Sequence, residues 1–336
     1  MYLGIEIGGT KLQLGVGSGI CSKLERLECL HVDVSRGSRG ILEQIQRTGR
    51  DLIDACGVSG IGIGFGGPID AHTGRVLTSH QVEGWDDFPL VEWCHDQFGL
   101  PVVLGNDCDA AALAEARLGA GRRLRTVFYV TVGTGIGGGL VIDGRLHGKG
   151  CPAVAEIGHL RPGLDASTEN MTVESVASGR GIENFITQTL LSQTTSSAAT
   201  DLLQRTRGDS ERLSAKIIAL AASDGNPIAR AAIDRAVATL GWAIAQVVTL
   251  IAPNVVVVGG GVSLMGEELF FTPLRTETRR YVFGPLADSF EILPAELGEA
   301  VVVHGAVAFA ASEDDVKGRA GKGSQSGRRP PCEPLR

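Results

Sequence analysis

The sequence predicts an α/β protein of two domains, and three observations support this prediction. Its 336 residues are enough for two ordinary domains, each with a core of its own. Short apolar strands alternate with helical stretches, as in layered α/β architectures. A glycine-rich turn between two apolar strands occurs in "GIEIGGTKLQLGVG" and again in "TVFYVTVGTGIGGGLVIDGRL". This weak internal repeat places one such hairpin in each half of the chain.

The first domain is expected over residues 1–119. In its first strand, Gly4 and Glu6 alternate with apolar residues, so Glu6 leaves on the face opposite the apolar set. The turn Gly8-Gly9-Thr10 then returns the chain into the strand "KLQLGVG". The later elements expected are a helix over 40–55, the strand "GIGIGFGGP", a helix over 89–98, the strand "PVVLGND" and an alanine-rich helix over 110–118.

The second domain is expected over residues 120–311, after a junction near 119–125. The second hairpin comes first, followed by a helical stretch over 175–191, a polar stretch over 193–210 with a surface loop, and a helix over 211–223. A long helix over 227–251 ends before Pro253, as the missing N–H and the ring of proline require. The strand "NVVVVGGGV" and a last helix over 301–311 complete the domain, and we expect that helix to pack back on the first domain.

Composition and charge exclude several classes of protein. Lys and Arg number 31 against 38 Asp and Glu, which gives a formal charge of −7 and argues against nucleic acid as a partner. The seven cysteines are scattered, which argues against a disulfide framework and favours reduced thiols in a cytoplasmic protein. The N-terminus lacks the pattern of a signal peptide, and polar residues and glycines interrupt the most apolar stretch, so no membrane span is expected. Residues 312–336 have too little apolar content to fold and are expected to form a disordered tail.

The two glycine-rich turns have a functional and a structural explanation. "GTGIGG" formally matches G-x-G-x-x-G, but the next segment alternates and reaches the hairpin turn Asp143-Gly144 instead of opening a helix. This argues against a dinucleotide-binding loop. In the functional explanation, successive backbone N–H groups converge on phosphate oxygens, and Thr10 and Thr134 add hydroxyl donors. In the structural one, tight hairpins need glycine for positive φ, and the presence of one such turn in each half favours the functional explanation.

Three further groups of residues each have a functional and a structural explanation. Asn106, Asp107 and Asp109 precede the alanine-rich helix, where capping explains one of the three but not all of them. Ligands gather at such strand ends, so a site is also expected there. Glu156 and His159 in "AEIGHLRP", with Glu174 further on, form either a surface pair or a binding group. The glycines of "VVVVGGGVS" either allow a tight turn or let a flat ligand approach the backbone.

The order of these motifs resembles the ROK family of sugar kinases and sugar-responsive repressors, which has a two-domain actin-like (ribonuclease H-like) ATPase fold with a central cleft. The matching stretches, from residue 1 to about 311, are "GIEIGGTK", "GIGFGGPID", "GNDCDAAALAE", "GTGIGGGLVIDGRLHGKG", "AEIGH", "VESVASGRGI" and "LIAPNVVVVGGGVS". The resemblance implies an ATP-dependent sugar kinase of carbohydrate metabolism and glycolysis, with a sugar and ATP as partners, Mg²⁺ as cofactor, and a homodimer as the assembly.

Carried over to this sequence, the resemblance implies that Asp107 is the general base that takes the proton of a sugar hydroxyl. The residues that would bind the sugar are Gly67, Asn106, Glu156, His159 and Glu174. The residues that would hold ATP are Gly8, Gly9, Thr10, Lys11, Gly133, Thr134, Gly135, Gly137, Gly260 and Gly261.

The sequence departs from the family pattern before Glu174. Most members carry a C-x-C-G-x-x-G-C zinc motif there, whereas this chain has "LRPGLDASTENMTV" without a cysteine. A structural zinc needs about four nitrogen or sulfur ligands, so we predict no zinc. Two smaller departures are Gly66, where the family has proline, and Asp109, where it has asparagine.

A further departure is Glu6, which stands where the family has aspartate, a residue expected to meet Mg²⁺-ATP through water. Glutamate keeps the charge and adds about one 1.5 Å bond length. Because Mg²⁺ normally retains several waters, a water-mediated contact tolerates this change better than direct coordination does. We therefore expect reduced but retained activity.

The resulting expectation is phosphorylation of the 6-hydroxyl of a hexose, with glucose as the first choice. The alternatives are an N-acetylglucosamine or N-acetylmannosamine kinase and a catalytically silent sugar-binding or regulatory member of the family. In repressors of this family a DNA-binding winged helix precedes the first phosphate motif. That motif begins here at Gly4, so a repressor is not expected.

Overall fold

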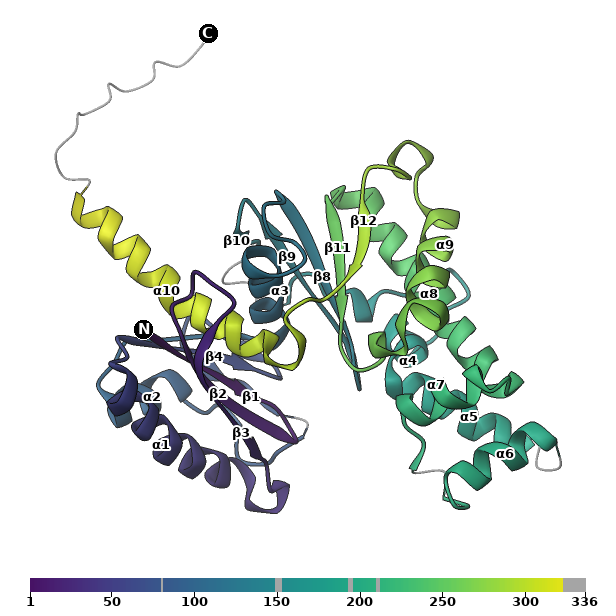
Figure 1. The fold of residues 1–336 in the computed structure, drawn as a ribbon, viewed down its shortest axis with the longest axis horizontal. Helices are drawn as coiled ribbons and strands as arrows, with labels where there is room; N and C mark the ends of the chain where they lie inside the picture. The colour runs from purple at the N-terminus through teal and green to yellow at the C-terminus, as the bar shows by residue number, and fades with distance from the viewer. Residues whose placement is uncertain (80, 149–152, 193–195, 210–211, 323–336) are drawn as a thin grey trace, which may run out of the picture.

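The structure, a computed structural model, describes residues 1–79, 81–148, 153–192, 196–209 and 212–322. It has two five-stranded sheets, each in its own half of the molecule, with helices on both faces (Figure 1). The α/β class expected from the sequence is confirmed.

The first sheet has the order β3-β2-β1-β4-β7. The strands are β1 (Tyr2–Ile7), β2 (Lys11–Gly17), β3 (Leu24–His31), β4 (Gly60–Phe65) and β7 (Val102–Asn106). β1, β2 and β3 pair antiparallel, whereas β1, β4 and β7 run parallel. One face packs on α1 (Gly37–Cys56) and α2 (Leu90–Phe98). The hairpin β5 (Ile69–Asp70) and β6 (Arg75–Val76) and the turn η1 (Val34–Arg36) complete this half.

The second sheet repeats this arrangement in the order β10-β9-β8-β11-β12. The strands are β8 (Thr126–Val132), β9 (Ile136–Ile142), β10 (Arg145–Leu146), β11 (Val255–Gly259) and β12 (Glu291–Pro294). The helices are α4 (Val173–Ala177), α5 (Gly179–Ser192), α6 (Ser197–Arg205), α7 (Ala215–Ser223), α8 (Pro227–Ile251) and α9 (Thr272–Tyr281). The single-turn elements are η2 (Ile157–His159), η4 (Ser263–Met265), the π-helix η5 (Glu267–Phe271), η6 (Gly284–Leu286) and η7 (Gly298–Ala300).

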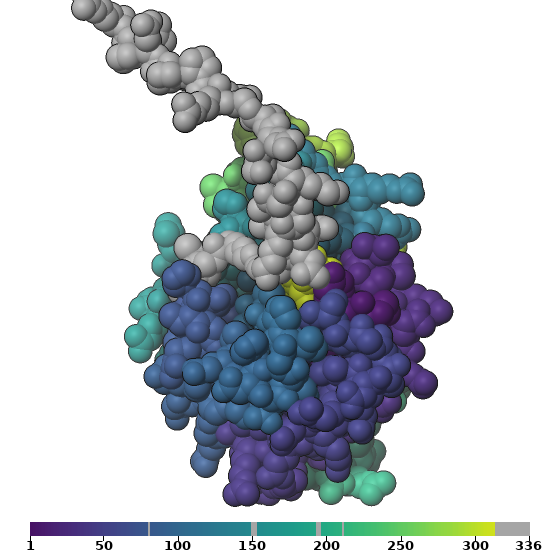
Figure 2. Space-filling view, turned by 90° about the vertical axis from the view of Figure 1, so that its left-hand side faces the viewer, coloured from purple at the N-terminus to yellow at the C-terminus, as the bar shows by residue number. Residues whose placement is uncertain are grey.

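Two helices, α3 (Asp107–Leu118) and α10 (Val301–Lys322), join the halves. α10 packs on β1 and β4 of the first sheet and on α3, while α3 also packs on β8 and β9 of the second. A Cβ at Gly62 would lie 1.8 Å from Ala306 O, and one at Gly305 would lie 1.9 Å from Ala110 O, so both contacts require glycine. α10 is yellow in Figure 1, and a few of its yellow residues are visible between the purple and blue residues of the first half in Figure 2.

The chain crosses between the two sheets twice. The first connection, residues 119–125, leads from α3 to β8, and the second, residues 295–300, leads from β12 to α10. Both lie in the middle of Figure 1, between the two sheets.

Several element boundaries differ from those expected. The helical stretch over 175–191 is divided at Ser178, whose extended backbone ends α4 and whose hydroxyl accepts the Gly181 N–H. α6 forms within the polar stretch expected to contain a loop. α10 continues to Lys322 rather than ending at Ala311, and residues 323–336 of the expected tail lie outside the described residues.

Among the described helices, α8 is long and apolar enough to cross a membrane by length and composition alone. In this fold 61% of its most apolar window is buried. It contributes Ala232, Leu240 and Ile244 to the main core of the second half, and this role as a core helix accounts for its composition.

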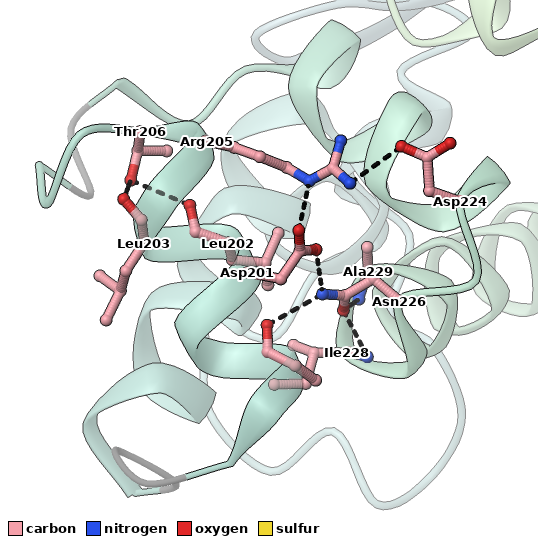
Figure 3. A network of polar contacts seen from close by, with 10 residues as sticks. Asp201, Leu202, Leu203, Arg205, Thr206, Asp224, Asn226, Ile228 and Ala229 are labelled. Carbon is pink, nitrogen blue, oxygen red and sulfur yellow. Dashed lines mark hydrogen bonds and ion pairs between the residues drawn. The ribbon is translucent and has the colours of Figure 1, made fainter.

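A network of polar contacts holds the start of α8 against α6 (Figure 3). The Asn226 side-chain oxygen accepts hydrogen bonds from the N–H groups of Ile228 and Ala229, at 3.0 and 3.1 Å, and caps the helix. Its amide nitrogen donates to Ala198 O and to Asp201 Oδ2, at 2.9 and 2.8 Å. The other oxygen of Asp201 accepts from Arg205 at 2.9 Å.

Replacing Asn226 by alanine removes both the cap and the donor to Asp201. Loss of the cap and of a buried hydrogen-bond partner should lower the free energy of unfolding by about 2–4 kcal/mol. Urea denaturation measures this change. The matched control, Arg230→Ala, breaks an exposed ion pair with Asp234 on the same helix and should cost no more than about 0.5 kcal/mol. Equal stability of the Asn226→Ala variant and the wild-type protein would contradict the proposed role of the network.

Candidate functional site

Glu6 and Lys11 meet beside the first glycine-rich turn. β1 carries Glu6 to the end of the sheet, where Oε1 lies 3.4 Å from Lys11 Nζ. Its other oxygen, Oε2, is buried and has no hydrogen-bond partner among the described residues. Burial raises the pKa of Glu6 to about 7; Lys11 opposes this shift, and the charges of Asp107 and Glu299 add to it. An unpartnered carboxylate oxygen in such a place is suited to a cation or to water held by one.

Asn106 and Asp107 stand where β7 ends and α3 begins. The Asn106 side-chain oxygen accepts from the N–H of Cys108 at 2.7 Å, so Asn106 is the cap of α3. Asp107 Oδ1 accepts from the same N–H at 2.8 Å, and Oδ2 lies on the side of Gly66. Burial raises the pKa of Asp107, while its hydrogen bond to Cys108 opposes the rise. The capping explanation therefore accounts for Asn106 and leaves Asp107 available for chemistry.

Further acidic residues from both halves gather around Asp107. Burial, with Glu156 and Asp107 as neighbours, raises the pKa of Asp109 to about 6. Partial burial also raises the pKa of Glu156; His159 opposes the shift, and Asp107 and Glu174 add to it. We call Asp107, Asp109, Glu156, His159 and Glu174 the polar cluster. The sequence places Asp109 at this strand end but assigns it no role in the site, and its position as the third polar residue after the strand was the signal for it.

Glu174 also braces the second glycine-rich turn. Its Oε2 accepts the Ile136 N–H at 2.7 Å, and a Cβ at Gly135 would lie 2.5 Å from the same oxygen. The Gly179 N–H donates to Gly133 O at 2.8 Å from the start of α5. One carboxylate therefore belongs to the polar cluster and fixes the turn.

The segment before Glu174, where the family has its zinc motif, is held by ordinary hydrogen bonds. The Val173 N–H donates to Leu160 O at 2.9 Å, and Thr172 and Ser175 form a capping box at the start of α4. Within the described part of the chain, no group of three or more His, Cys, Asp or Glu side chains is arranged to hold a metal ion. Cys151 and Cys332 lie outside the described residues.

A pocket of about 300 Å³ opens beside the second turn. It is lined by Gly133, Thr134, Gly179, Arg180, Glu183, Ala215, Gly261 and Val262. Arg180 and Glu183 were not predicted site residues, since an arginine and a glutamate on a helical stretch look like solvated positions. The pocket lining includes the hydroxyl of Thr134 and the cation of Arg180, groups of the kind that bind phosphate.

In the glycine run after β11, the surrounding backbone requires glycine at Gly260, whereas Gly261 has room for a side chain. Gly260 has φ of +89°, and a Cβ there would lie 2.5 Å from Val132 O. Gly261 borders the pocket, and nothing lies within 4 Å of the Cβ it lacks. The tight-turn explanation therefore holds for Gly260, whereas Gly261 leaves open space beside the pocket.

The remaining predicted residues are placed as follows. In the first turn, the Gly8 N–H donates to Lys11 O at 3.0 Å, and Thr10 O accepts from Val32 at 3.1 Å. Gln81 lies directly over Gly9, because a Cβ there would be 1.6 Å from its Oε1. Gly67 packs against the Phe65 ring, and Gly137 makes room for Cys108 Sγ, at 3.0 and 2.3 Å from the missing Cβ atoms. Gln81 was not predicted, and no local pattern distinguishes it.

Solved structures with this architecture define the class. A ROK family glucokinase from Streptomyces griseus, solved in complex with glucose and AMPPNP, matches with a TM-score of 0.78 and 30% identity over 93% of this chain and 99% of its own. ROK hexokinase from Thermus thermophilus matches with a TM-score of 0.77 and 28% identity, over 94% and 99% of the two chains. The fold is the actin-like ATPase fold of these sugar kinases.

The ROK family model matches residues 2–313, and the chain belongs to the ROK family. Glucokinase of Thermotoga maritima is 30% identical over 315 residues, which cover 91% of this chain and 96% of the relative. An N-acetylgalactosamine kinase of Shewanella is also 30% identical, over 91% and 95% of the two chains. A putative xylose repressor of Caldicellulosiruptor is 30% identical over 76% of this chain and 63% of its own. These relatives support a sugar kinase and leave the sugar open.

The two glycines after β11, Gly260 and Gly261, allow the backbone packing of the second half to be tested. Gly260→Ala forces a side chain into the Val132 backbone at positive φ and should cost about 2 kcal/mol or more in unfolding free energy. Gly261→Ala, the neighbouring control, has open space and should change stability by no more than about 0.5 kcal/mol. Thermal unfolding followed by circular dichroism compares the two. Equal melting temperatures for both variants would contradict the contact with Val132.

Proposed function

We propose that the protein is an ATP-dependent hexokinase that phosphorylates the 6-hydroxyl of glucose, with Asp107 as general base. The observation that carries the proposal is the position of Asp107: a half-buried carboxylate at the start of α3, within electrostatic reach of Glu6 on one side and Glu156 on the other. The similarity to glucokinases along nearly the whole chain supports glucose as the first sugar to test.

The reaction needs a base because a sugar hydroxyl hardly ionises at neutral pH. As the sugar oxygen forms its bond to the γ-phosphorus, Asp107 takes the hydroxyl proton and the bond between the γ-phosphorus and the β,γ-bridging oxygen breaks, which releases ADP. Base catalysis of this kind contributes typically about 10²- to 10⁴-fold. The remaining acceleration comes from positioning and from backbone donors that stabilise charge on the phosphoryl group.

Asn106 and three members of the polar cluster would orient the sugar. Asn106, Glu156, His159 and Glu174 offer hydroxyl partners around Asp107, and Gly67 offers its backbone. A site left with unpaired polar groups penalises a sugar that lacks the matching hydroxyl. Residues from both halves contribute, so a bound sugar would bring the halves together and exclude water, which otherwise competes as the nucleophile.

ATP would occupy the pocket beside the second turn, with its phosphates between Gly8–Lys11 and Gly133–Gly137 and its adenosine beside Gly260 and Gly261. Glu6 fits a role toward Mg²⁺, because its Oε2 is buried without a partner among the described residues. Mg²⁺, when bound with ATP, supplies positive charge that neutralises the phosphates. Lys11 would hold the Glu6 side chain in position. We further propose that the protein is cytoplasmic and forms a homodimer.

An N-acetylhexosamine kinase is the second candidate, supported by the similarity to an N-acetylgalactosamine kinase. ADP release over glucose, mannose, fructose, N-acetylglucosamine, N-acetylmannosamine and N-acetylgalactosamine separates the candidates. Highest kcat/KM for glucose supports the proposal, and highest kcat/KM for an acetylated sugar supports the second candidate. No sugar-dependent turnover with any of the six would favour a silent sugar-binding protein.

Asp107→Asn tests the base. The amide cannot take the proton, so kcat should fall by about 10²- to 10⁴-fold. Sugar binding, measured by calorimetry, should persist because the amide keeps the size and one acceptor oxygen. The control Asp96→Asn, an exposed acid on α2, should keep wild-type kcat. Full activity of Asp107→Asn would refute the mechanism.

Glu6 variants test the carboxylate beside the first turn. Glu6→Asp restores the residue usual in the family and should leave turnover equal or higher. Glu6→Gln removes the charge and should lower kcat by at least about 10-fold, since charge on the phosphoryl group is then less well compensated. Steady-state assays over a range of Mg²⁺ concentrations measure both. Unchanged turnover in Glu6→Gln would remove Glu6 from the mechanism.

A further inference from the structure

Glu115 is a buried carboxylate that the proposed reaction does not use. It lies in the last turns of α3 and is 0% exposed, and among the described residues no other acidic side chain is classed as buried. Taking a charge out of water is costly unless several hydrogen bonds replace the lost hydration. A buried carboxylate whose two oxygens both accept hydrogen bonds therefore indicates that those hydrogen bonds have a structural or functional role.

The partners of Glu115 come from both connections between the sheets. Oε2 accepts the Ala120 N–H of the first connection at 2.8 Å. Oε1 accepts the N–H groups of Glu296 and Leu297 in the second connection, at 3.0 and 2.9 Å. One side chain thus ties together the two segments by which the chain crosses from one half to the other.

The surroundings leave this carboxylate little freedom. A Cβ at Gly119 would lie 2.0 Å from Glu115 Oε2, so glycine there makes room for the side chain. The backbone oxygen of Glu115 accepts the N–H groups of Gly119 and Gly121 at 3.2 and 3.0 Å. On the surface, Arg122 of the first connection pairs with Glu296 of the second.

The second connection leads from Glu115 to the first glycine-rich turn. η7 (Gly298–Ala300) follows Leu297 directly, and Glu299 O within it accepts a hydrogen bond from Lys11 Nζ at 3.2 Å. Lys11 in turn lies 3.4 Å from Glu6 Oε1. A shift of residues 296–299 would therefore move the partner of the lysine that orients Glu6.

We propose that Glu115 is a positioning residue that sets how the two halves face one another by holding both connections at once. It keeps Asp107 of the first half aligned with the second turn of the other half, and through Glu299 it keeps Lys11 beside Glu6. This inference rests on the proposed function for its effect on rate, but not for its effect on the connections.

The variant Glu115→Gln keeps the shape of the side chain and replaces one acceptor oxygen by an NH₂ group, which would face N–H donors. Because misplacement by about 1 Å can cost about 10²-fold, we expect kcat to fall by about 10- to 100-fold. The KM for ATP should rise by no more than about 3-fold, because the variant disturbs Lys11 and the first turn but leaves the pocket beside the second turn, which lies within one half, as it is. Assays run well below the melting temperature of each variant separate this effect from simple loss of stability. The control Glu43→Gln removes an exposed charge on α1 and should keep wild-type kinetics.

Hydrogen exchange read by mass spectrometry tests the contacts without any turnover. Peptides covering 119–125 and 295–300 should exchange faster in Glu115→Gln than in the wild-type protein, and those of α8 should not. If Glu115→Gln fails to fold, Gly119→Ala, which pushes the carboxylate aside, takes its place in both measurements with the same expectations.

The outcomes separate the two proposals. A lower kcat with a near-constant KM for ATP and faster exchange at both connections supports the positioning role. A lower melting temperature with unchanged kcat, or unchanged exchange at either connection, overturns it. If the wild-type protein phosphorylates no sugar, the proposed function fails, and the exchange result alone then decides for or against Glu115.

Discussion

The close packing of α3 against α10 is the constraint on which the arrangement of the molecule depends. The two helices cross where Gly305 meets the Ala110 backbone, and Gly62 lets α10 lie directly on β4. Since α3 begins at Asp107 and also packs on β8 and β9, this contact fixes the carboxylate relative to both sheets. A side chain at Gly305 would push α10 away from α3, and one at Gly62 would push α10 away from β4, so either would disturb the packing behind Asp107.

Much of this fold could be predicted because its signals are local. The β1–β2 and β8–β9 hairpins show glycine turns between alternating apolar residues, and α8 shows a cap, an apolar stretch and a proline beyond its end. β3 has mostly exposed side chains at a sheet edge, so its sequence lacks the alternation of a half-buried strand. α6 lies in a polar stretch, and within the helix itself only Ala199 and Leu202 are buried, too few to produce a clear helical period.

The candidate site also has a part that could be predicted from the sequence and a part that could not. Asp107, Glu156 and Glu174 stand in recognisable motifs, yet the bond from the Ile136 N–H to Glu174 joins segments far apart in the chain. Gln81 over Gly9 and Arg180 in the pocket depend on tertiary placement, and no spacing in the sequence encodes it. Glu115 in an alanine-rich helix looks like a solvated position, because its three donors come from loops that only the folded chain brings near.

The repeated strand order has a consequence for how ligands act on the molecule. Each half carries one glycine-rich turn and part of the polar cluster: Asp107 and Asp109 in the first, Glu156 and Glu174 in the second. A molecule that contacts both sets acts as a third link between the halves, in addition to the two covalent ones. Binding free energy then appears as resistance to unfolding, growing with the logarithm of ligand concentration. Ligands bound at such a site therefore help to hold the two halves of the molecule together.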